Sequence, residues 1–360
     1  MNSNFYYSFP AIRGYQAQRE YYVIMCPFKI LSKLFIFNDE DIPPEYRAQR
    51  ILNKARIPEI SKYIINNPTD YLFSSLTASV DGEIIFTSYV NDNSNNIGNL
   101  QISMDSTLLI NDGQHRKAAI EEALKINAAL GSETVSVVLF IDENLKRSQQ
   151  MFSDLNKHAV TISKSIGILY DSRDPISILT KDIINSIPVL RNYTDSENRS
   201  LSKNSTKLFT LSNIYEANKK IIGKNSIDDK NLQKFILDFW IFLCDNLKDL
   251  QFVFNKEISP PKFRESYILS YGVVLESLGL IANYIYNNRI NNWKDILIDL
   301  NKIDWNRNNL KDWRGRAISI NGRISKNSNC IKLTTILIKQ KINLPLTKEE
   351  LKLENNFRKE

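Results

Sequence analysis

The chain has 360 residues and a mass of 41.7 kDa, enough for two domains that each bury a core of their own. Hydrophobic residues make up 42% of it and charged residues 24%, which excludes a largely disordered or collagen-like protein. Its 47 basic and 40 acidic residues give a formal charge of +7. The three cysteines are odd in number and far apart, which excludes a disulfide framework and predicts a reducing, cytoplasmic location.

Neither export nor a membrane span is expected. The first ten residues lack the basic start and the apolar stretch of a signal peptide. The most apolar segment, residues 267–286, contains Glu276, Ser270 and Ser277, so a buried helix is favoured over a transmembrane one.

The first 99 residues predict a mixture of strands and helices. Residues 21–37 are rich in β-branched and aromatic types and are broken by Pro27, which predicts a strand, a bend and a second apolar element. Residues 45–66 predict helices, with Pro58 in the first turn of the second one. Residues 71–90 predict a β-hairpin that turns at Asp81-Gly82, and the Asn- and Ser-rich residues 91–99 predict an exposed loop.

A strand, turn, helix, strand unit follows. Residues 106–111 predict a short strand, Asp112-Gly113 a tight turn, residues 114–127 a helix that ends near Gly131, and residues 134–141 a second buried strand. A further helix is predicted over residues 143–158.

The character of the chain changes after residue 196. A Ser-, Thr- and Lys-rich passage leads into helical patterns over residues 213–301, and two short helices are predicted within residues 333–354. The fold class predicted is therefore α+β, with an N-terminal α/β domain over residues 1–210 and a mostly α-helical domain over residues 211–360.

The turn at Asp112-Gly113 is the main candidate for a binding site. It places the backbone amides of Gln114, His115 and Arg116 at a helix N-terminus, where the helix dipole favours phosphate oxygens and Gly113 permits close approach. Walker A and GxGxxG loops are absent from the sequence. The alternative is that Asp112 caps the helix and that the next side chains decorate its first turn.

Other chemistries have weaker support. The chain has two histidines, His115 and His158, but their spacing from Asp112 and Asp154 does not suggest a metal site, so none is predicted. The sequence contains no nucleophile-elbow pattern. Cys26 follows an apolar run, where a small buried residue is more usual than a reactive thiol.

A basic segment lies near the C-terminus. Between Arg307 and Lys341, nine basic residues accompany one acidic residue, Asp312, for a local charge of +8, which leaves the rest of the chain close to neutral. Such a segment predicts a polyanionic partner, nucleic acid before anionic membrane, and a solvated basic tail is the alternative. The candidates for DNA phosphate contacts stand among glycines and serines that let a backbone approach; they are Arg314, Arg316, Arg323 and Lys326.

Three of the four tryptophans, Trp293, Trp305 and Trp313, lie in or just before the basic segment. A tryptophan beside an arginine suits either stacking on bases or anchoring the segment to its domain. Anchoring is favoured for Trp293 and Trp305.

The chain resembles the DGQHR-domain family, and within it the DndB proteins of bacterial DNA phosphorothioate (sulfur) modification. The string Asp112 to Arg116 carries the resemblance to the wider family. The more specific likeness rests on runs spread along nearly the whole chain: RGYQ at 13–16, QRILNKARIPEISKY at 49–63, LTASVDGE at 76–83, MFSDLNKHA at 151–159 and KLFTLSNIY at 207–215.

The resemblance implies a ParB/sulfiredoxin-like fold for the N-terminal domain, in which a Gly-x-His-Arg string at a helix start binds nucleotide phosphates. It implies ATP with Mg²⁺ as the cofactor and an ATPase activity as an expectation. The implied nucleotide-binding residues are Asp112, Gly113, Gln114, His115 and Arg116, and all of these except Gly113 are also the candidate catalytic residues. Asp112 or Gln114 would orient the attacking water, and Arg116 would offset developing charge. Gln114 stands where sulfiredoxins carry a reactive cysteine, so their repair chemistry is not expected.

The function implied is that of a repressor that binds promoter DNA and limits expression of the modification genes, with an affinity for DNA that changes when ATP binds. Cys26, just ahead of Pro27, matches a position implied to be regulatory. Further partners implied are a second copy of the chain and proteins of the modification complex. The alternative is an ATPase subunit that partners a DNA-modifying enzyme. A nuclease is least favoured, because no paired-carboxylate metal motif is visible.

Overall fold

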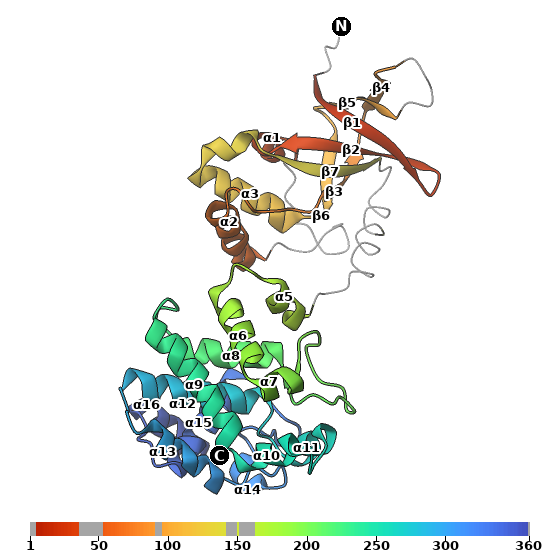
Figure 1. The fold of residues 1–360 in the computed structure, drawn as a ribbon. Helices are drawn as coiled ribbons and strands as arrows, with labels where there is room; N and C mark the ends of the chain where they lie inside the picture. The colour runs from red at the N-terminus through yellow and green to blue at the C-terminus, as the bar shows by residue number, and fades with distance from the viewer. Residues whose placement is uncertain (1–4, 36–52, 91–95, 142–149, 151–162, 359–360) are drawn as a thin grey trace. The chain divides into compact units, whose positions relative to one another are not determined.

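The computed structural model describes all residues except 1–4, 36–52, 91–95, 142–149, 151–162 and 359–360. The chain divides into two compact units, residues 1–160 and 161–360. Unit 1 is a mixed α+β unit and unit 2 is largely helical (Figure 1), so the predicted α+β class is confirmed. The predicted helix over residues 143–158 lies almost wholly outside the described residues.

Unit 1 is built on a seven-stranded sheet in the order β4-β5-β1-β2-β7-β3-β6. Every neighbouring pair is antiparallel except β3 and β7, which are parallel. The strands are β1 (Tyr6–Gln16), β2 (Arg19–Pro27), β3 (Leu76–Asp81), β4 (Ile84–Ser88), β5 (Ile97–Ser103), β6 (Thr107–Asp112) and β7 (Thr134–Ile141).

The hairpin predicted at Asp81-Gly82 is wrong. β3 pairs with β6 and β7, whereas β4 pairs with β5, so β3 and β4 are not partners. β3 and β4 instead follow one another along the first arm of a long antiparallel hairpin, and β5 and β6 follow one another along its second arm. β4 therefore pairs with β5, and β3 pairs with β6. Gly82, at φ +139°, bends the first arm, and a Cβ there would lie 2.8 Å from Cα of Ser106 on the second. The glycine therefore marks a bend inside an arm rather than a turn between partner strands.

Three helices of unit 1 pack together beside the sheet: α1 (Phe28–Leu34), α2 (Ile57–Asn66) and α3 (Gln114–Ile126). The predicted bend at Pro27 is confirmed, because this proline ends β2 and is the N-cap of α1. Pro58 lies in the first turn of α2, as predicted. Short 3-10 segments at Lys54–Arg56 and Ala128–Ser132 precede α2 and follow α3. The strand, turn, helix, strand unit over β6, α3 and β7 is also confirmed.

Unit 2 is helical apart from one short strand pair. Its elements are α5 (Lys164–Tyr170), α6 (Pro175–Ser186), α7 (Pro188–Tyr193), β8 (Thr194–Asp195), β9 (Phe209–Thr210), α8 (Leu211–Ile222), α9 (Lys230–Asn246), α10 (Lys248–Phe254), α11 (Pro260–Ser266), α12 (Gly272–Asn287), α13 (Trp293–Ile298), a 3-10 turn at Asp299–Lys302, α14 (Leu310–Trp313), α15 (Ser328–Lys341) and α16 (Lys348–Phe357).

Helix α12 lies at the centre of unit 2 and packs against α8, α9 and α15. Its buried positions surround the helix, as expected of an interior helix. Gly279 allows the close approach of α8, since a Cβ there would lie 2.5 Å from the carbonyl oxygen of Ala217. No helix in the described ranges is both long enough and apolar enough to cross a membrane.

The division between the units lies some fifty residues before the boundary predicted at residue 210. The reason is packing: Ile168, Ile183 and Leu190, on α5 to α7, belong to the same buried hydrophobic cluster as Ile214 on α8. The Ser-, Thr- and Lys-rich passage after residue 196 is therefore a loop within the helical unit rather than a linker between domains.

Candidate functional site

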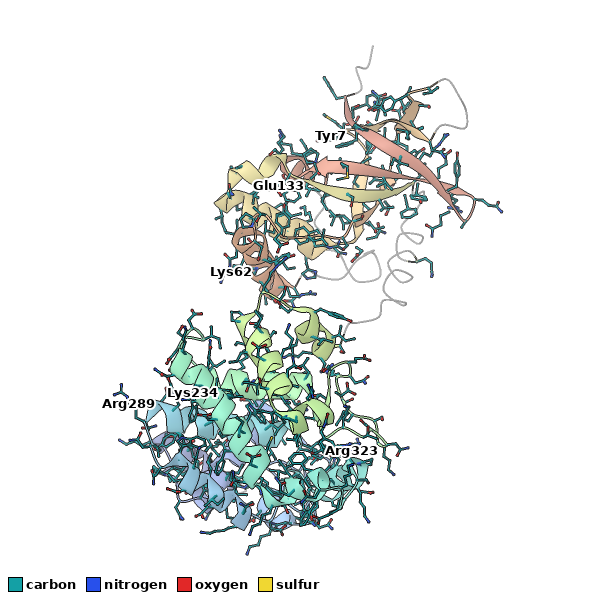
Figure 2. All side chains as sticks on the ribbon, in the orientation of Figure 1. Tyr7, Lys62, Glu133, Lys234, Arg289 and Arg323 are labelled. Atoms are coloured by element: carbon teal, nitrogen blue, oxygen red, sulfur yellow. The ribbon has the colours of Figure 1, made fainter. Side chains whose placement is uncertain are left out.

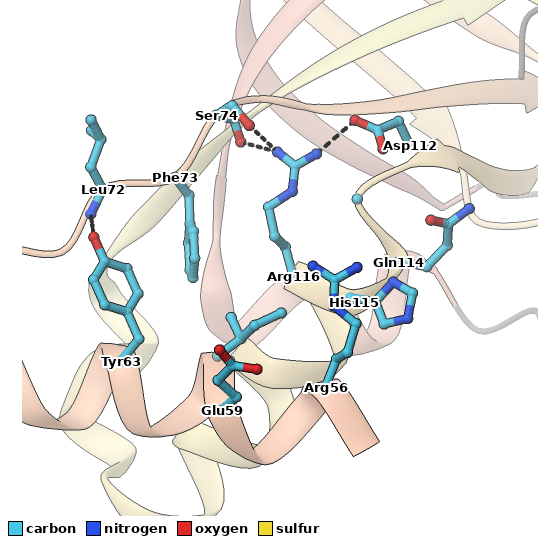
Figure 3. A pocket seen from close by; sticks show the side chains of 12 residues that line it. Arg56, Glu59, Tyr63, Leu72, Phe73, Ser74, Asp112, Gln114, His115 and Arg116 are labelled. Carbon is cyan, nitrogen blue, oxygen red and sulfur yellow. Dashed lines mark hydrogen bonds and ion pairs between the residues drawn. The ribbon is translucent and has the colours of Figure 1, made fainter. Parts of the chain in front are cut away.

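A cleft of about 550 Å³ opens in unit 1 where β6 runs into α3 (Figure 3). The string predicted to bind phosphate forms one side of it. The lining residues come from α2, from the segment before β3 and from the start of α3; they are Arg56, Glu59, Ile60, Tyr63, Leu72, Phe73, Ser74 and Asp112 to Arg116.

Gly113 makes the turn into α3 at φ +107°, in the left-handed region that glycine adopts without strain. It is the N-cap residue of α3, and none of the described side chains caps this helix. A Cβ at Gly113 would lie 2.4 Å from Cδ2 of the buried Leu76. Gly113 rather than Asp112 is therefore the N-cap, which corrects the alternative in which Asp112 caps the helix. The first turn of α3 lines the cleft, and its amides have no side-chain acceptor among the described residues.

The guanidinium of Arg116 forms hydrogen bonds and an ion pair with other residues of unit 1. Its Nη1 donates to the carbonyl and hydroxyl oxygens of Ser74, each at 2.5 Å, and to the carbonyl oxygen of Ser75 at 2.8 Å. Its Nη2 lies 2.7 Å from Oδ2 of Asp112. The guanidinium thus fastens the strand entering β3 to the turn before α3, and both Arg116 and Asp112 are engaged with each other (Figure 3).

The side chain of Gln114, the first residue of α3, points back toward the end of β6. Its Nε2 lies 3.4 Å from the carbonyl oxygens of Ile110 and Asn111. These are weak contacts by their length. The predicted water-orienting group is thus directed at the end of β6 in this structure.

His115 accepts a hydrogen bond. The backbone N–H of Asn53 donates to its Nε2 at 2.9 Å. An accepting Nε2 carries no proton, so the bond favours the neutral imidazole. Burial lowers the pKa of His115, and the positive charge of Arg56 lowers it further.

Arg56 is the functional candidate that the sequence analysis missed. It is exposed, stands at the start of α2 beside His115, and forms no ion pair among the described residues (Figure 3). Glu59 lies one turn further along α2, and Tyr63 and Phe73 form an aromatic wall with ring centroids 6.2 Å apart. A signal for Arg56 did exist, because it lies within the run at 49–63 that carries part of the family resemblance.

The predicted DNA contacts in unit 2 fall into different environments. Arg316 is 5% exposed, its Nη2 lies 2.7 Å from Oε1 of Glu354, and its Nη1 donates to the carbonyl oxygen of Leu333 at 2.7 Å. This burial corrects the prediction for Arg316, because a guanidinium committed to an interior carboxylate is not offered to an external phosphate. Lys326 is partly exposed and paired, with Nζ 2.7 Å from Oε1 of Glu276.

Arg314 and Arg323 remain exposed, and neither forms an ion pair among the described residues. Figure 2 shows the side chain of Arg323 at the surface of unit 2. Lys311 and Lys332 share these properties. Other members of the basic segment are neutralised by carboxylates: Lys339 pairs with Glu350 at 2.7 Å and Lys341 with Asp312 at 3.0 Å. Five cations of the predicted +8 cluster form no ion pair among the described residues. Four of them, Lys311, Arg314, Arg323 and Lys332, are exposed and are here together called the basic surface, whereas the fifth, Arg307, is half-buried.

The three tryptophans in or just before the basic segment pack within unit 2 and so anchor the segment to it. Trp305 and Trp313 are buried and stacked, with ring centroids 5.3 Å apart, and each indole N–H donates to a backbone carbonyl. Trp293 packs edge-on against Phe235 and Phe242. Anchoring is confirmed for Trp293 and Trp305 and extends to Trp313.

Cys26 lies in the core of the sheet on β2 and is fully buried. Burial raises the pKa of its thiol to about 12, so the reactive thiolate is suppressed at neutral pH. A regulatory reaction at Cys26 would require β2 to open.

The described residues contain no group of three or more His, Cys, Asp or Glu side chains placed to hold a metal ion. His158 lies outside the described residues. Magnesium bound through a nucleotide needs only one or two protein carboxylates, and Glu59 and Asp112 line the cleft.

Comparison with protein families gives a match along nearly the whole chain. A family model described as DndB, DNA-sulfur modification-associated, matches residues 9–345. The chain belongs to the DndB family. Membership of the DndB family connects this protein with DNA sulfur modification, and both the cleft and the basic surface fall within the matched residues. Curated proteins and solved structures gave no match, so the ParB/sulfiredoxin likeness of unit 1 stays a prediction.

Proposed function

We propose that this member of the DndB family is a DNA-binding regulator of DNA sulfur modification genes, and that a nucleotide held in the cleft of unit 1 tunes its affinity for promoter DNA. The observation that carries the proposal is the start of α3. Its first turn lines a cleft and has no capping side chain from the described residues, and the exposed Arg56, which forms no ion pair among those residues, lines the same cleft. A helix N-terminus supplemented by an exposed guanidinium favours phosphate oxygens.

The roles within the cleft follow from the contacts. Arg56 and the amides of α3 would bind phosphate, whereas Arg116 would keep the cleft in shape through Ser74, Ser75 and Asp112. The apolar wall around Tyr63 and Phe73 would face the less polar part of the nucleotide. Glu59 or Asp112 would hold a Mg²⁺ ion that enters with the nucleotide, and the ion would offset the negative charge of the phosphates.

DNA would be bound through phosphate contacts of the basic surface. Exposed Lys and Arg side chains displace counterions from DNA, which makes binding depend steeply on salt. Arg314 and Arg323 support this role because no carboxylate in the described part of the chain neutralises either of them.

The direct test is fluorescence anisotropy with the protein's own upstream promoter duplex and a scrambled duplex, at several salt concentrations, with and without ATP. We expect tighter binding to the promoter and a shift in affinity with ATP. Arg56→Gln should bind DNA normally but lose the ATP effect. Equal, weak binding to both duplexes with no response to ATP would exclude the proposal.

The ATPase alternative has one observation in its favour. His115 lines the same cleft, and burial together with the positive charge of Arg56 lowers its pKa, which favours the neutral imidazole. Its Nε2 would accept a proton only after releasing the backbone N–H of Asn53. Steady phosphate release without DNA, abolished in His115→Ala, would favour this alternative. Release at the wild-type rate in His115→Ala would remove it.

A further inference from the structure

A loop of unit 2, residues 196–208, has its ends held together. The parallel pair β8 and β9 joins Thr194 to Phe209 and Asp195 to Thr210 at the neck of the loop. Figure 1 shows this segment, in green, running out from the helices of the unit. A compact loop with joined ends is an Ω-loop, a type that is frequently functional.

A buried arginine holds the second half of this Ω-loop, residues 202–207, in place. Arg264, on α11, is 7% exposed and forms no ion pair among the described residues. Its guanidinium donates instead to four backbone carbonyl oxygens of the loop: Ser202 at 2.9 Å, Lys203 at 3.0 Å, Ser205 at 2.7 Å, and Lys207. Because a buried charge is costly unless it is fully hydrogen-bonded, the loop and Arg264 stabilise each other in one conformation.

The first half of the Ω-loop is held at residues 197 and 198 by Asp195. Its carboxylate accepts from the backbone N–H groups of Glu197 at 2.9 Å and Asn198 at 2.7 Å. The hydroxyl of Ser165 donates to the carbonyl oxygen of Asn198 at 2.8 Å. Both halves are thus held from inside the unit.

The exposed side chains of the Ω-loop are mostly cations and small polar groups. Arg199 and Lys203 are exposed and have no ion-pair partner among the described residues. The exposed side chains around them are hydroxyls and an amide, Ser200, Ser202, Asn204 and Thr206, and the loop has one acidic residue, Glu197. Cations interspersed with hydroxyl and amide groups are the side chains that contact the phosphates and sugars of DNA.

The Ω-loop is linked to the turn that carries Arg323 through α11 and Arg307. The C-terminal end of α11 accepts a bond from Arg307, whose backbone N–H lies 2.7 Å from the carbonyl oxygen of Ser266. The side chain of Arg307 in turn donates to the carbonyl oxygen of Gly322 at 3.1 Å. The same short helix therefore holds the Ω-loop through Arg264 and the Arg323 turn through Ser266.

We propose that the Ω-loop is a second DNA contact, in which Arg199 and Lys203 bind backbone phosphates beside those bound by the basic surface. This inference rests on the proposed DNA-binding function and extends it to a segment that lies well before the basic surface in the chain. Arg264 is a positioning residue, since it reaches DNA only through the loop that it orders.

The experiment measures binding of the full chain to promoter duplex by anisotropy across a salt series. The double variant R199Q/K203Q should weaken binding by about tenfold at about 150 mM salt and reduce the salt slope by about 2, because each of the two cations neutralises one DNA phosphate. The matched control K230Q/K234Q removes two exposed lysines from α9 and should leave the slope unchanged. Arg264→Lys keeps the charge but loses the planar fork, so it should increase amide exchange over residues 199–206 and weaken DNA binding.

The outcomes separate the two proposals. Wild-type affinity and slope in R199Q/K203Q, together with a loss in R314Q/R323Q, would overturn the Ω-loop contact and leave the regulator function standing. A loss in K230Q/K234Q equal to that in R199Q/K203Q would also overturn it, because the effect would then reflect net charge alone. Failure of the wild-type protein to bind any duplex would overturn both.

Discussion

Arg316 and Glu354 form an ion pair in the interior of unit 2, with 2.7 Å between Nη2 and Oε1, and each side chain is less than a tenth exposed. The ring of Phe357 lies over the guanidinium, 4.4 Å from its carbon to the ring centroid. Arg314, two residues earlier, is exposed. Neighbouring arginines in one basic segment thus have opposite roles, the one structural and the other available to a partner.

The first prediction concerns this pair. Arg316→Gln should lower the free energy of unfolding by about 3 kcal/mol, because it leaves the Glu354 carboxylate buried without its main partner. The salt slope of DNA binding should not change. Urea denaturation and anisotropy measure the two effects. Arg358→Gln is the control, since Arg358 pairs with the same carboxylate but is largely exposed and should cost little.

The same carboxylate predicts an effect of acid. Burial alone would raise the pKa of Glu354, but hydrogen bonds from Arg316 and Arg358 outweigh it and leave the pKa lowered. A lowered folded pKa contributes stability above the ordinary value of 4.5 that is lost as pH falls through the folded pKa. Glu354→Gln should therefore be less stable than the wild type at pH 7, and the difference should shrink below pH 4.5. A constant difference across this range would contradict the assignment.

The turn into α3 predicts a second effect on stability. Gly113→Ala should destabilise the protein by about 2 kcal/mol, because alanine is strained at φ +107° and its Cβ would strike Leu76. Gly167→Ala is the matched control: this glycine lies within α5 and has nothing within 4 Å of an added Cβ. The control should gain up to about 1 kcal/mol from helix propensity. Thermal denaturation of both variants decides whether Gly113 is required by its geometry.

The arginines of the cleft should respond differently to substitution. Arg56→Gln should weaken ATP binding by about tenfold without changing the thermal midpoint, because Arg56 makes no ion pair among the described residues. Arg116→Lys should lower the midpoint, since one ammonium cannot replace the fork that holds Ser74, Ser75 and Asp112. Calorimetry gives both quantities. An unchanged midpoint in Arg116→Lys would show that Arg116 does not maintain the cleft.

His115 predicts a second pH dependence of stability, caused by burial and a neighbouring positive charge rather than by ion pairing. Its folded pKa lies below the ordinary value of 6.5, so the folded state holds the proton less readily than the unfolded state. This group contributes stability above pH 6.5 that is lost as pH falls through the folded pKa. His115→Gln should therefore lose less stability than the wild type between about pH 7.5 and pH 5.5, with His158 kept in both proteins. Equal losses would mean that His115 is not the group responsible.

The cysteines should differ in reactivity. Cys330 is half exposed, whereas Cys26 and Cys244 are buried and burial raises the pKa of each to about 12. A thiol reagent at about pH 8 should label Cys330 first and the other two only in denaturant. Rapid labelling of Cys26 in the folded protein would show that β2 opens readily.

The local structure around the cleft was predictable from the sequence. The turn at Asp112-Gly113, the helix after it and the breaks at Pro27 and Pro58 depend on residues close together in the chain, and all are confirmed. Arg56 was missed as a site residue because it reaches the cleft only through the packing of α2 on α3, which no local pattern reveals.

What the sequence by itself determined is the two-part α+β organisation, the helix start that faces the cleft, and the family. Only the tertiary structure decided which strands pair and which charges are left exposed. Asp81-Gly82 has the local pattern of a hairpin turn, yet the strands on either side of it have separate partners. The +8 segment is partly neutralised by carboxylates elsewhere in the unit, such as Glu276 and Glu354. Local propensity acts between neighbours along the chain, whereas strand partners and ion pairs depend on contacts that the folded core brings together.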